Sequence, residues 1–189
     1  HPFAGRPHIG THISLANNTH LLYAGSTWNL FQKGKKKMDK RAEFNAALKN
    51  AMKEKDQMVV STIRLILAAL KDRDISARAK GNAEGVDEKE ILSMLQAMIK
   101  QRQESAKTYC DAGREELAER EEQEIAVIQK FLPKQLSEEE VSTIIDDLIA
   151  EVGAESVRDM GKVMGVMKEK YAGQVDMSKA GGIVKGKLA

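Results

Sequence analysis

The chain has 189 residues, of which 30 are Lys or Arg and 28 are Asp or Glu, so its formal net charge is +2. Its 42% hydrophobic and 31% charged residues are typical of a globular helical protein, and its 4% aromatic content argues against an all-β fold. The single cysteine, Cys110, excludes an intrachain disulfide framework and a zinc site made of several cysteines. Because no run of about 18 apolar residues is present, no membrane-spanning helix is expected.

Residues 1–37 differ in composition from the rest of the chain. They contain all four histidines, the only tryptophan and five basic residues, but no acidic residue. Because a helix-like pattern begins at Met38, we expect 1–37 to be a disordered leader derived from a vector or from upstream translation. One alternative is an organelle transit peptide, which would also be free of acidic residues, although this segment is poor in arginine. Another is a nucleic-acid patch at the three lysines of 35–37.

Apolar residues at helical spacing predict four helices in the next part of the chain, over 38–55, 58–79, 88–111 and 114–132. Since the first two are separated only by a short break at 56–57, we expect them to form an antiparallel hairpin. A polar loop with two glycines follows at 80–85. Gly113 bends the chain before the fourth helix, and Pro133 ends that helix at a hinge.

Three further helices are predicted in residues 135–189. Ser137 with Glu140 has the spacing of a capping box, and Gly153 ends the helix that begins there. Ser156 with Asp159 starts a second helix, and either Asp176 or Ser178 caps the third. No stretch alternates like a strand. The sequence therefore predicts an all-α fold with an N-terminal long-helix hairpin or bundle over 38–134 and a C-terminal three-helix subdomain over 135–189.

The chemistry available to residues 38–189 is limited, because this part of the chain contains no histidine. Ser-His-Asp and Cys-His catalysis are excluded, as are histidine-based metal sites. The glutamates between 115 and 124 could suggest metal ligands, but a solvated helix face with ion pairs is the simpler interpretation. We therefore predict no catalytic residue, no cofactor, no metal and no autonomous enzymatic activity.

Basic residues are concentrated at the end of the chain. Residues 158–189 contain seven Lys or Arg and three Asp or Glu. Such a segment attracts phosphate backbones without reading sequence, although an ordinary solvated surface is the alternative. In the N-terminal part, Arg64 and Lys71 lie seven residues apart on one helix face, where they could contact a ligand or RNA, or could only cover apolar surface.

Several stretches of the sequence together resemble one known family. They include Arg64-Leu65, Ala69-Leu70-Lys71, Lys100-Gln101-Arg102-Gln103-Glu104-Ser105, Ala112-Gly113-Arg114, Phe131-Leu132-Pro133-Lys134-Gln135-Leu136 and Asp159-Met160-Gly161-Lys162-Val163-Met164. In this order and spacing they are similar to the YqeY family, whose members share the GatB/YqeY domain. The resemblance implies an all-α fold whose C-terminal part looks like the tail domain of the GatB subunit of tRNA-dependent amidotransferase, which helps to hold tRNA.

We accordingly expect a non-catalytic, tRNA-associated accessory protein of the bacterial cytoplasm, with tRNA or a tRNA-handling enzyme as partner and no membrane or metal. The expected contacts to the tRNA backbone are Gly161, Lys162, Lys168, Lys170, Lys185 and Lys187. Possible ligand or RNA contacts in the N-terminal subdomain are Arg64, Lys71, Lys100 and Arg114. Two alternatives stay open. One is an amidotransferase-like activity, a carbon–nitrogen ligation with glutamine as amide donor. The other is a protein–protein interaction module.

Overall fold

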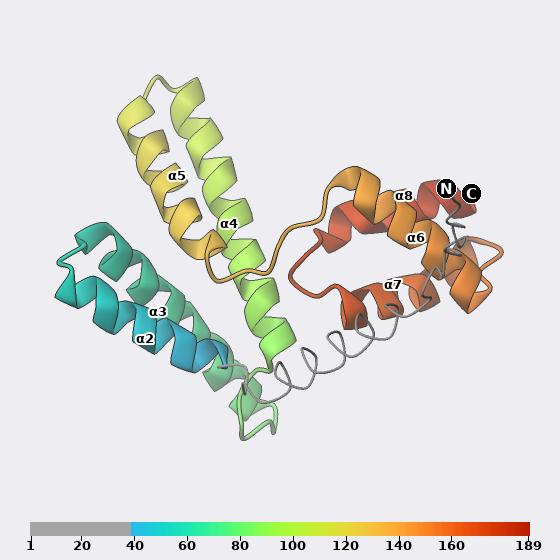
Figure 1. The fold of residues 1–189 in the computed structure, drawn as a ribbon, viewed down its shortest axis with the longest axis horizontal. Helices are drawn as coiled ribbons and strands as arrows, with labels where there is room; N and C mark the ends of the chain where they lie inside the picture. The colour runs from blue at the N-terminus through green and yellow to red at the C-terminus, as the bar shows by residue number, and fades with distance from the viewer. Residues whose placement is uncertain (1–38) are drawn as a thin grey trace, which may run out of the picture. The chain divides into compact units, whose positions relative to one another are not determined.

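Helices make up all the regular secondary structure of residues 39–189, which are the residues that the computed structural model describes (Figure 1). The elements are α2 (Lys40–Lys53), α3 (Gln57–Ala79), α4 (Glu88–Asp111), α5 (Glu115–Gln129), α6 (Glu138–Val152), the 3-10 helix η1 (Val157–Asp159), α7 (Met160–Lys170) and α8 (Met177–Leu188). The all-α prediction is confirmed. The leader predicted over 1–37 lies outside the described residues.

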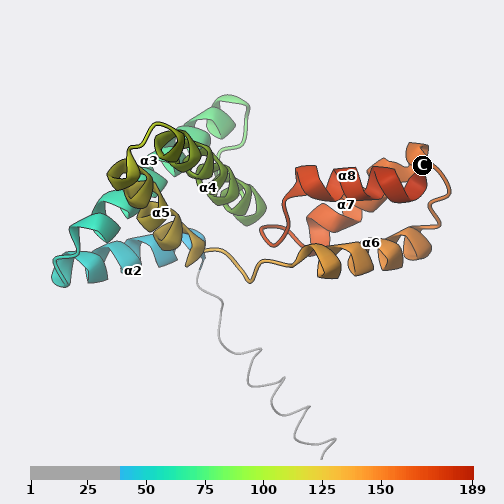
Figure 2. The same cartoon turned by 90° about the horizontal axis from the view of Figure 1, so that it is seen from above.

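Helices α2 and α3 form a hairpin with a tight turn. The carboxylate of Asp39 accepts the N–H of Ala42 at the start of α2 (2.8 Å), and that of Asp56 accepts the N–H of Val59 at the start of α3 (3.2 Å). Between the helices Lys55 adopts a left-handed conformation, with φ of 57°, which lets the chain reverse within three residues. Figures 1 and 2 show the two helices side by side.

A buried carboxylate holds the open end of this hairpin to the loop that precedes α4. Asp74 Oδ1 accepts the backbone N–H of Val86 (2.9 Å) and a guanidinium N–H of Arg41 (2.5 Å). The same Arg41 nitrogen also donates to the carbonyl of Val86 (3.1 Å). Gly85 must be glycine here, because its φ is +86° and a Cβ would overlap the Asp74 carboxylate.

The first apolar core lies between α2, α3, α4 and α5. Its fully buried side chains include Phe44, Ile63, Ile66, Ile91, Met94, Leu95 and Ile128. The rings of Phe44 and Phe131 meet edge to face, with centroids 5.0 Å apart. A buried ion pair between Arg102 Nε and Glu124 Oε2 (2.9 Å) links α4 to α5. The buried Lys40 ammonium donates to the carbonyl of Phe131, which ties α2 to the end of α5.

The second apolar core lies between α6, α7 and α8. Its buried residues are Val141, Ile145, Leu148, Val163, Met167, Val175, Ala180 and Val184. The helix boundaries follow the predicted caps: the Ser137 hydroxyl accepts the N–H of Glu140 (3.2 Å), and Gly153 ends α6 in the left-handed conformation with φ of 66°. Of the two caps considered for the last helix, Asp176 is the one used.

One hydrogen bond connects α4 to the segment before α8, and a second joins the segment after Pro133 to the loop that follows α7. The side-chain amide of Gln96 on α4 donates to the carbonyl of Val175 (3.0 Å), and that of Gln135 donates to the carbonyl of Gly173 (2.6 Å). A Cβ on Gly173 would lie only 3.0 Å from Leu92. Because 39–189 form a single compact unit, the division into subdomains at residue 134 stays a prediction.

Candidate nucleic-acid interface

The expected RNA-binding residues begin on α7, where two glycines leave the helix backbone open. A Cβ added to Gly161 or Gly165 would meet no atom within 4 Å. These glycines lie in a shallow, open hollow whose other lining residues are Glu151, Val152, Lys162, Val166, Glu169 and Lys170. Because a glycine has no Cβ, two of them on one exposed side leave a surface that a ligand backbone could approach closely. Each glycine also lowers the stability of the helix.

Three of the five candidate lysines already have carboxylate partners. Lys162 Nζ lies 3.6 Å from Asp159, Lys170 Nζ lies 3.3 Å from Glu151 on α6, and Lys187 Nζ lies 2.7 Å from Asp146 on α6. Lys168 and Lys185 are exposed and have no ion pair within residues 39–189. A phosphate would meet two unpaired ammonium groups and three whose charge is offset by a neighbouring carboxylate.

The partner of Lys162 is a carboxylate with a structural role. Asp159 Oδ2 accepts the backbone N–H groups of Glu155 (3.0 Å) and Ser156 (3.4 Å), which shape the turn before α7. These hydrogen bonds, first that of Glu155, hold the pKa of the Asp159 carboxyl below its usual range, and the nearby Lys162 ammonium acts in the same direction. Asp159 therefore remains ionised at neutral pH and continues to offset the charge of Lys162.

The candidate lysines do not share one helix face. At about 100° per residue, Lys162 and Lys170 point within about 80° of each other, while Lys168 projects from the other side of α7. On α8 the same arithmetic puts Lys185 and Lys187 about 160° apart. The side chain of Lys187 turns toward α6, where it meets Asp146. The local excess of basic residues read from the sequence is thus spread around the two helices.

The four N-terminal candidates lie on three different parts of the chain. Arg64 and Lys71 are exposed on α3, two turns apart and on the same side. Arg114 precedes α5, where its Nε lies 3.1 Å from Glu116. Lys100 is on α4 and lines a cleft described below. Only Arg64 and Lys71 therefore belong to one surface.

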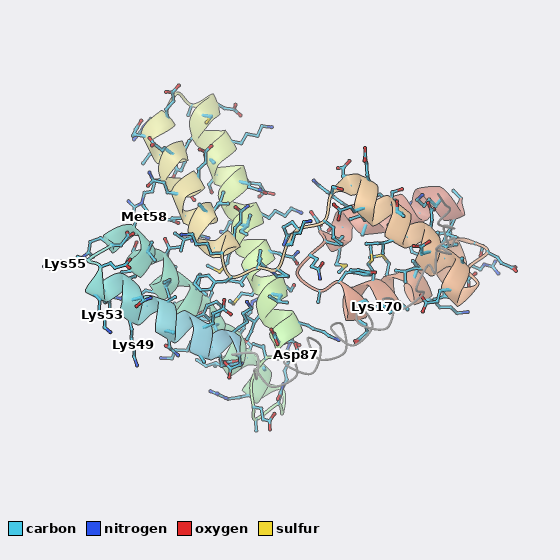
Figure 3. All side chains as sticks on the ribbon, in the orientation of Figure 1. Lys49, Lys53, Lys55, Met58, Asp87 and Lys170 are labelled. Carbon is cyan, nitrogen blue, oxygen red and sulfur yellow. The ribbon has the colours of Figure 1, made fainter. Side chains whose placement is uncertain are left out.

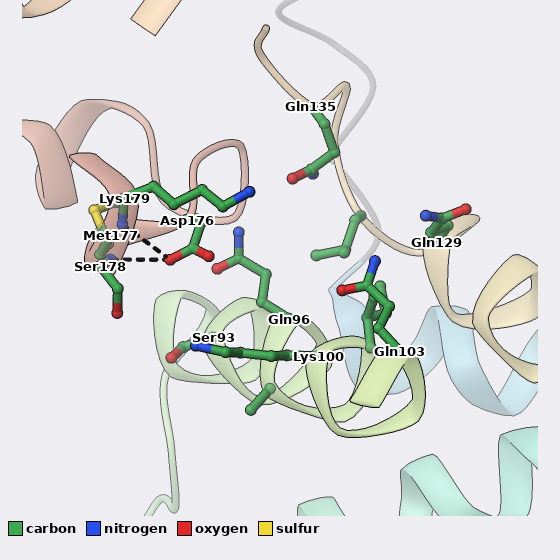
Figure 4. Close-up of a pocket in the computed structure, with 13 residues that line it drawn as sticks. Ser93, Gln96, Lys100, Gln103, Gln129, Gln135, Asp176, Met177, Ser178 and Lys179 are labelled. Carbon is green, nitrogen blue, oxygen red and sulfur yellow. Dashed lines mark hydrogen bonds between the residues drawn. The ribbon is translucent and has the colours of Figure 1, made fainter. Parts of the chain in front are cut away.

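The cleft that contains Lys100 lies between α4 and the chain that leads into α8 (Figure 4). Its volume is about 420 Å³, and its polar lining includes Gln96, Lys100, Gln103, Gln129, Gln135, Asp176 and Lys179. Two of the four glutamine amides already donate to backbone carbonyls, those of Val175 and Gly173. No sequence signal indicates this cleft beyond the polar spacing of residues 96, 100 and 103, because several of its other lining residues lie further along the chain.

The described residues show few signs of other chemistry. In residues 39–189 no group of three or more His, Cys, Asp or Glu side chains could hold a metal ion. None of the helices in this same range has the length and apolar character that a membrane span requires. Cys110 is exposed near the end of α4 and is unpaired.

One protein family matches the sequence of this chain over most of its length. The sequence model of YqeY-like proteins matches residues 41–188, which includes every described helix except the first residue of α2. The chain belongs to the YqeY-like protein family. The resemblance drawn from the sequence is therefore confirmed.

Curated relatives of this YqeY-like chain come from yeasts and carry the name altered inheritance of mitochondria protein 41, mitochondrial. The protein of Lachancea thermotolerans is 32% identical over 117 residues, which is 61% of this chain and 60% of that protein. The protein of Candida glabrata is 36% identical over 85 residues, or 45% of each chain. That of Saccharomyces cerevisiae strain YJM789 is 28% identical over 124 residues, or 62% of this chain and 64% of that protein. The chain thus spans about three fifths of the length of the first of these relatives.

These relatives correct one expectation. The sequence alone led to a bacterial cytoplasmic protein, but the matching proteins are from yeasts and their names place them in mitochondria. The cytoplasmic prediction is contradicted. It rested on the family resemblance alone, because nothing in residues 38–189 encodes a compartment.

Proposed function

We propose that this YqeY-like chain is a non-catalytic accessory protein that binds the phosphate backbone of a folded tRNA through α7 and α8. The observation that carries the proposal is the shallow hollow on α7, where Gly161 and Gly165 leave the helix backbone open beside the ammonium groups of Lys162 and Lys170. A sugar–phosphate chain can lie against such a surface, because no Cβ at either glycine keeps it away. Of the charged residues that line it, Lys162 and Lys170 attract a phosphate and Glu151 and Glu169 repel it. The similarity to the GatB tail supports tRNA as the RNA.

The arrangement of charges makes this binding weak and sensitive to salt. Lys168 and Lys185 are available to a phosphate at once, whereas Lys162, Lys170 and Lys187 would have to exchange a carboxylate partner for it. Contacts of this kind position a nucleic acid without reading its bases. The chain would therefore help another protein to hold tRNA and would not choose one tRNA by itself.

The protein is proposed to act in mitochondria, as the names of its yeast relatives say of them. The composition of 1–37, with five basic and no acidic residues, supports the transit-peptide interpretation of that segment. A fluorescent protein fused after residue 189 should enter mitochondria of yeast cells when 1–37 are present and should remain outside when the chain starts at Met38. Equal distribution of both fusions would reject a targeting role for 1–37.

A titration with an unmodified tRNA transcript at about 50 and about 200 mM salt tests the RNA function. The full chain is compared with Lys162→Glu/Lys168→Glu/Lys170→Glu, in which three ammonium groups of α7 are reversed. A matched control reverses three exposed lysines of other segments, Lys107→Glu/Lys130→Glu/Lys134→Glu, so that the net charge changes equally. The α7 variant should bind at least tenfold more weakly than the control. Absent binding by the unmodified chain at the lower salt concentration would reject the function.

Glutamine-dependent amide transfer, the enzymatic alternative, is less well supported. Residues 38–189 contain no histidine that could move a proton near neutral pH. The two carboxyl groups whose pKa values are clearly displaced, Asp74 and Asp159, are both lowered and both hold backbone N–H groups. Release of ammonia from glutamine by the full chain, measured against a heat-denatured control, would restore this alternative.

A further inference from the structure

The N-terminal part of the chain is electrically divided between its two helix hairpins. Residues 39–80, which form α2 and α3, contain ten basic and six acidic residues. Residues 81–134, which include α4 and α5, contain eight basic and twelve acidic residues. The two excesses cancel, so the balanced charge of residues 38–134 conceals a basic hairpin.

Most of the cations of this hairpin are free, whereas most of its carboxylates are engaged. Within residues 39–189, only Lys40 and Arg41 of this hairpin form ion pairs. The exposed basic residues without an ion pair in the described part of the chain are Lys49, Lys53, Lys55, Arg64, Lys71, Arg73, Arg78 and Lys80. Four of the six carboxylates are used in these two ion pairs and as helix caps, which leaves Glu54 and Asp72.

Four of the free cations are exposed on the two helices of the hairpin. On α2, Lys49 and Lys53 lie one turn apart, opposite the buried Phe44, and Figure 3 shows both side chains projecting away from the helices of the core. On α3, Arg64 and Lys71 occupy the exposed side, about 10 Å apart along the helix. These four exposed cations of the two antiparallel helices, Lys49, Lys53, Arg64 and Lys71, are here together called the outer hairpin face.

The composition of this face favours a phosphate backbone over other anionic partners. The only aromatic residue of α2 and α3 is the buried Phe44, so no side chain is available to stack on unpaired bases. A membrane-bound amphipathic helix has a broad apolar side, but the apolar sides of α2 and α3 are buried in the core. The exposed large apolar residues of these helices are the scattered Met52, Leu65 and Ile75.

We propose that the outer hairpin face binds the phosphate backbone of an RNA stem and contributes more to RNA affinity than the lysines of α7 do. This inference rests on the proposed RNA association and names its main surface. The four cations of the face lack carboxylate partners, whereas two of the three α7 lysines have one. A free ammonium group binds phosphate without first losing an ion pair, and the counterions released from RNA drive the association.

The test uses the full chain, the tRNA transcript and three triple variants. The hairpin variant is Lys49→Glu/Lys53→Glu/Lys71→Glu, and it is compared with the α7 variant and the control variant described above. All three change the net charge equally, and circular dichroism checks that each keeps its helical content. If the hairpin variant does not fold, Lys49→Gln/Lys53→Gln/Lys71→Gln removes the same positive charges without adding negative ones.

The hairpin variant should bind the transcript at least tenfold more weakly than the control variant, and more weakly than the α7 variant. The slope of log affinity against log salt should become less steep by about two to three units, as expected for three lost phosphate contacts. Binding equal to that of the control variant would overturn the inference, and the proposed function would stand if the α7 variant alone lost affinity. No binding by the unmodified chain would reject both. The unmodified chain could instead bind vesicles of anionic lipid and not RNA, and the hairpin variant could lose this binding. That result would assign the face to a membrane and would also overturn the inference.

Discussion

The buried Asp74 carboxylate gives a direct test of how the basic hairpin is held to the rest of the first core. Replacing it in Asp74→Ala removes the acceptor of the Val86 N–H and of one guanidinium N–H of Arg41. A hydrogen bond to a charged group contributes about 1.5–3 kcal/mol, and a buried N–H left without a partner costs about 1–3 kcal/mol. The Arg41 side chain is 37% exposed, so water replaces much of its lost contact. We expect a loss of about 2–4 kcal/mol in the free energy of unfolding.

Asp72→Ala is the matched control, because Asp72 lies two residues earlier on α3, is exposed and forms no ion pair within residues 39–189. Both substitutions replace aspartate by the better helix former alanine, which stabilises each variant by about 0.5 kcal/mol. Urea unfolding followed by circular dichroism measures both. If the free energies of unfolding of Asp74→Ala and Asp72→Ala differ by under about 1 kcal/mol, the carboxylate does not hold the hairpin in the way described.

The same carboxylate makes a prediction about pH. Burial by itself raises the pKa of Asp74, but the Val86 N–H and the Arg41 guanidinium outweigh it, so the pKa in the folded protein lies below its usual value. A group with a lowered pKa stabilises the fold above its unfolded pKa of about 3.9, and this stabilisation is lost as the pH falls through the folded-state pKa. The stability difference between the unmodified chain and Asp74→Asn should therefore shrink as the pH falls below about 4. A difference that is constant from pH 7 to pH 3 would contradict the assignment.

Three further substitutions test other parts of the fold, each by urea unfolding. Gly85→Ala should destabilise the protein by about 2 kcal/mol or more, because its Cβ would enter the space of the Asp74 carboxylate at a positive φ; an effect below about 0.5 kcal/mol would show that the loop relaxes freely. Ser137→Ala should cost about 1 kcal/mol through loss of the α6 cap; Ser142→Ala, in the middle of α6, serves as its control. Glu124→Ala should cost about 3 kcal/mol, since it leaves the largely buried Arg102 without its partner; a neutral result would mean that Arg102 reaches water.

The helices were predictable because each is marked by local signals. Asp87 and Ser137 cap helices that begin at the following residue, and Gly153 ends α6 in the left-handed conformation expected of a C-terminal glycine. The ends were less accurate where the signal was only a change in polarity. The fourth helix was expected over 114–132, but α5 ends at Gln129, and the residues before Pro133 leave the helix early.

Tertiary pairing is what the sequence did not reveal. Nothing local connects Asp74 with Val86, or Gln135 with Gly173, because such contacts depend on how distant helices pack. The polar cleft of α4 was missed for the same reason, since its lining residues come from distant segments of the chain. The cellular compartment of the protein could not be predicted from residues 38–189, because the folding and packing of these residues do not depend on where the protein is located.

Charge counts along the sequence do not show which cations have carboxylate partners, and the structure does. The basic excess of residues 158–189 looks like an RNA-binding patch, but the acidic segment before it folds back as α6 and supplies Glu151 and Asp146 to Lys170 and Lys187. The hairpin of α2 and α3 lies in a stretch whose counts balance, yet the acidic residues that balance it belong mainly to α4 and α5. At physiological salt, screening limits each charge to a range of about 8 Å, so a phosphate responds to the local surface and not to the sum over a segment. By that criterion, exposed cations without a carboxylate partner count for more in phosphate binding than cations that already have one.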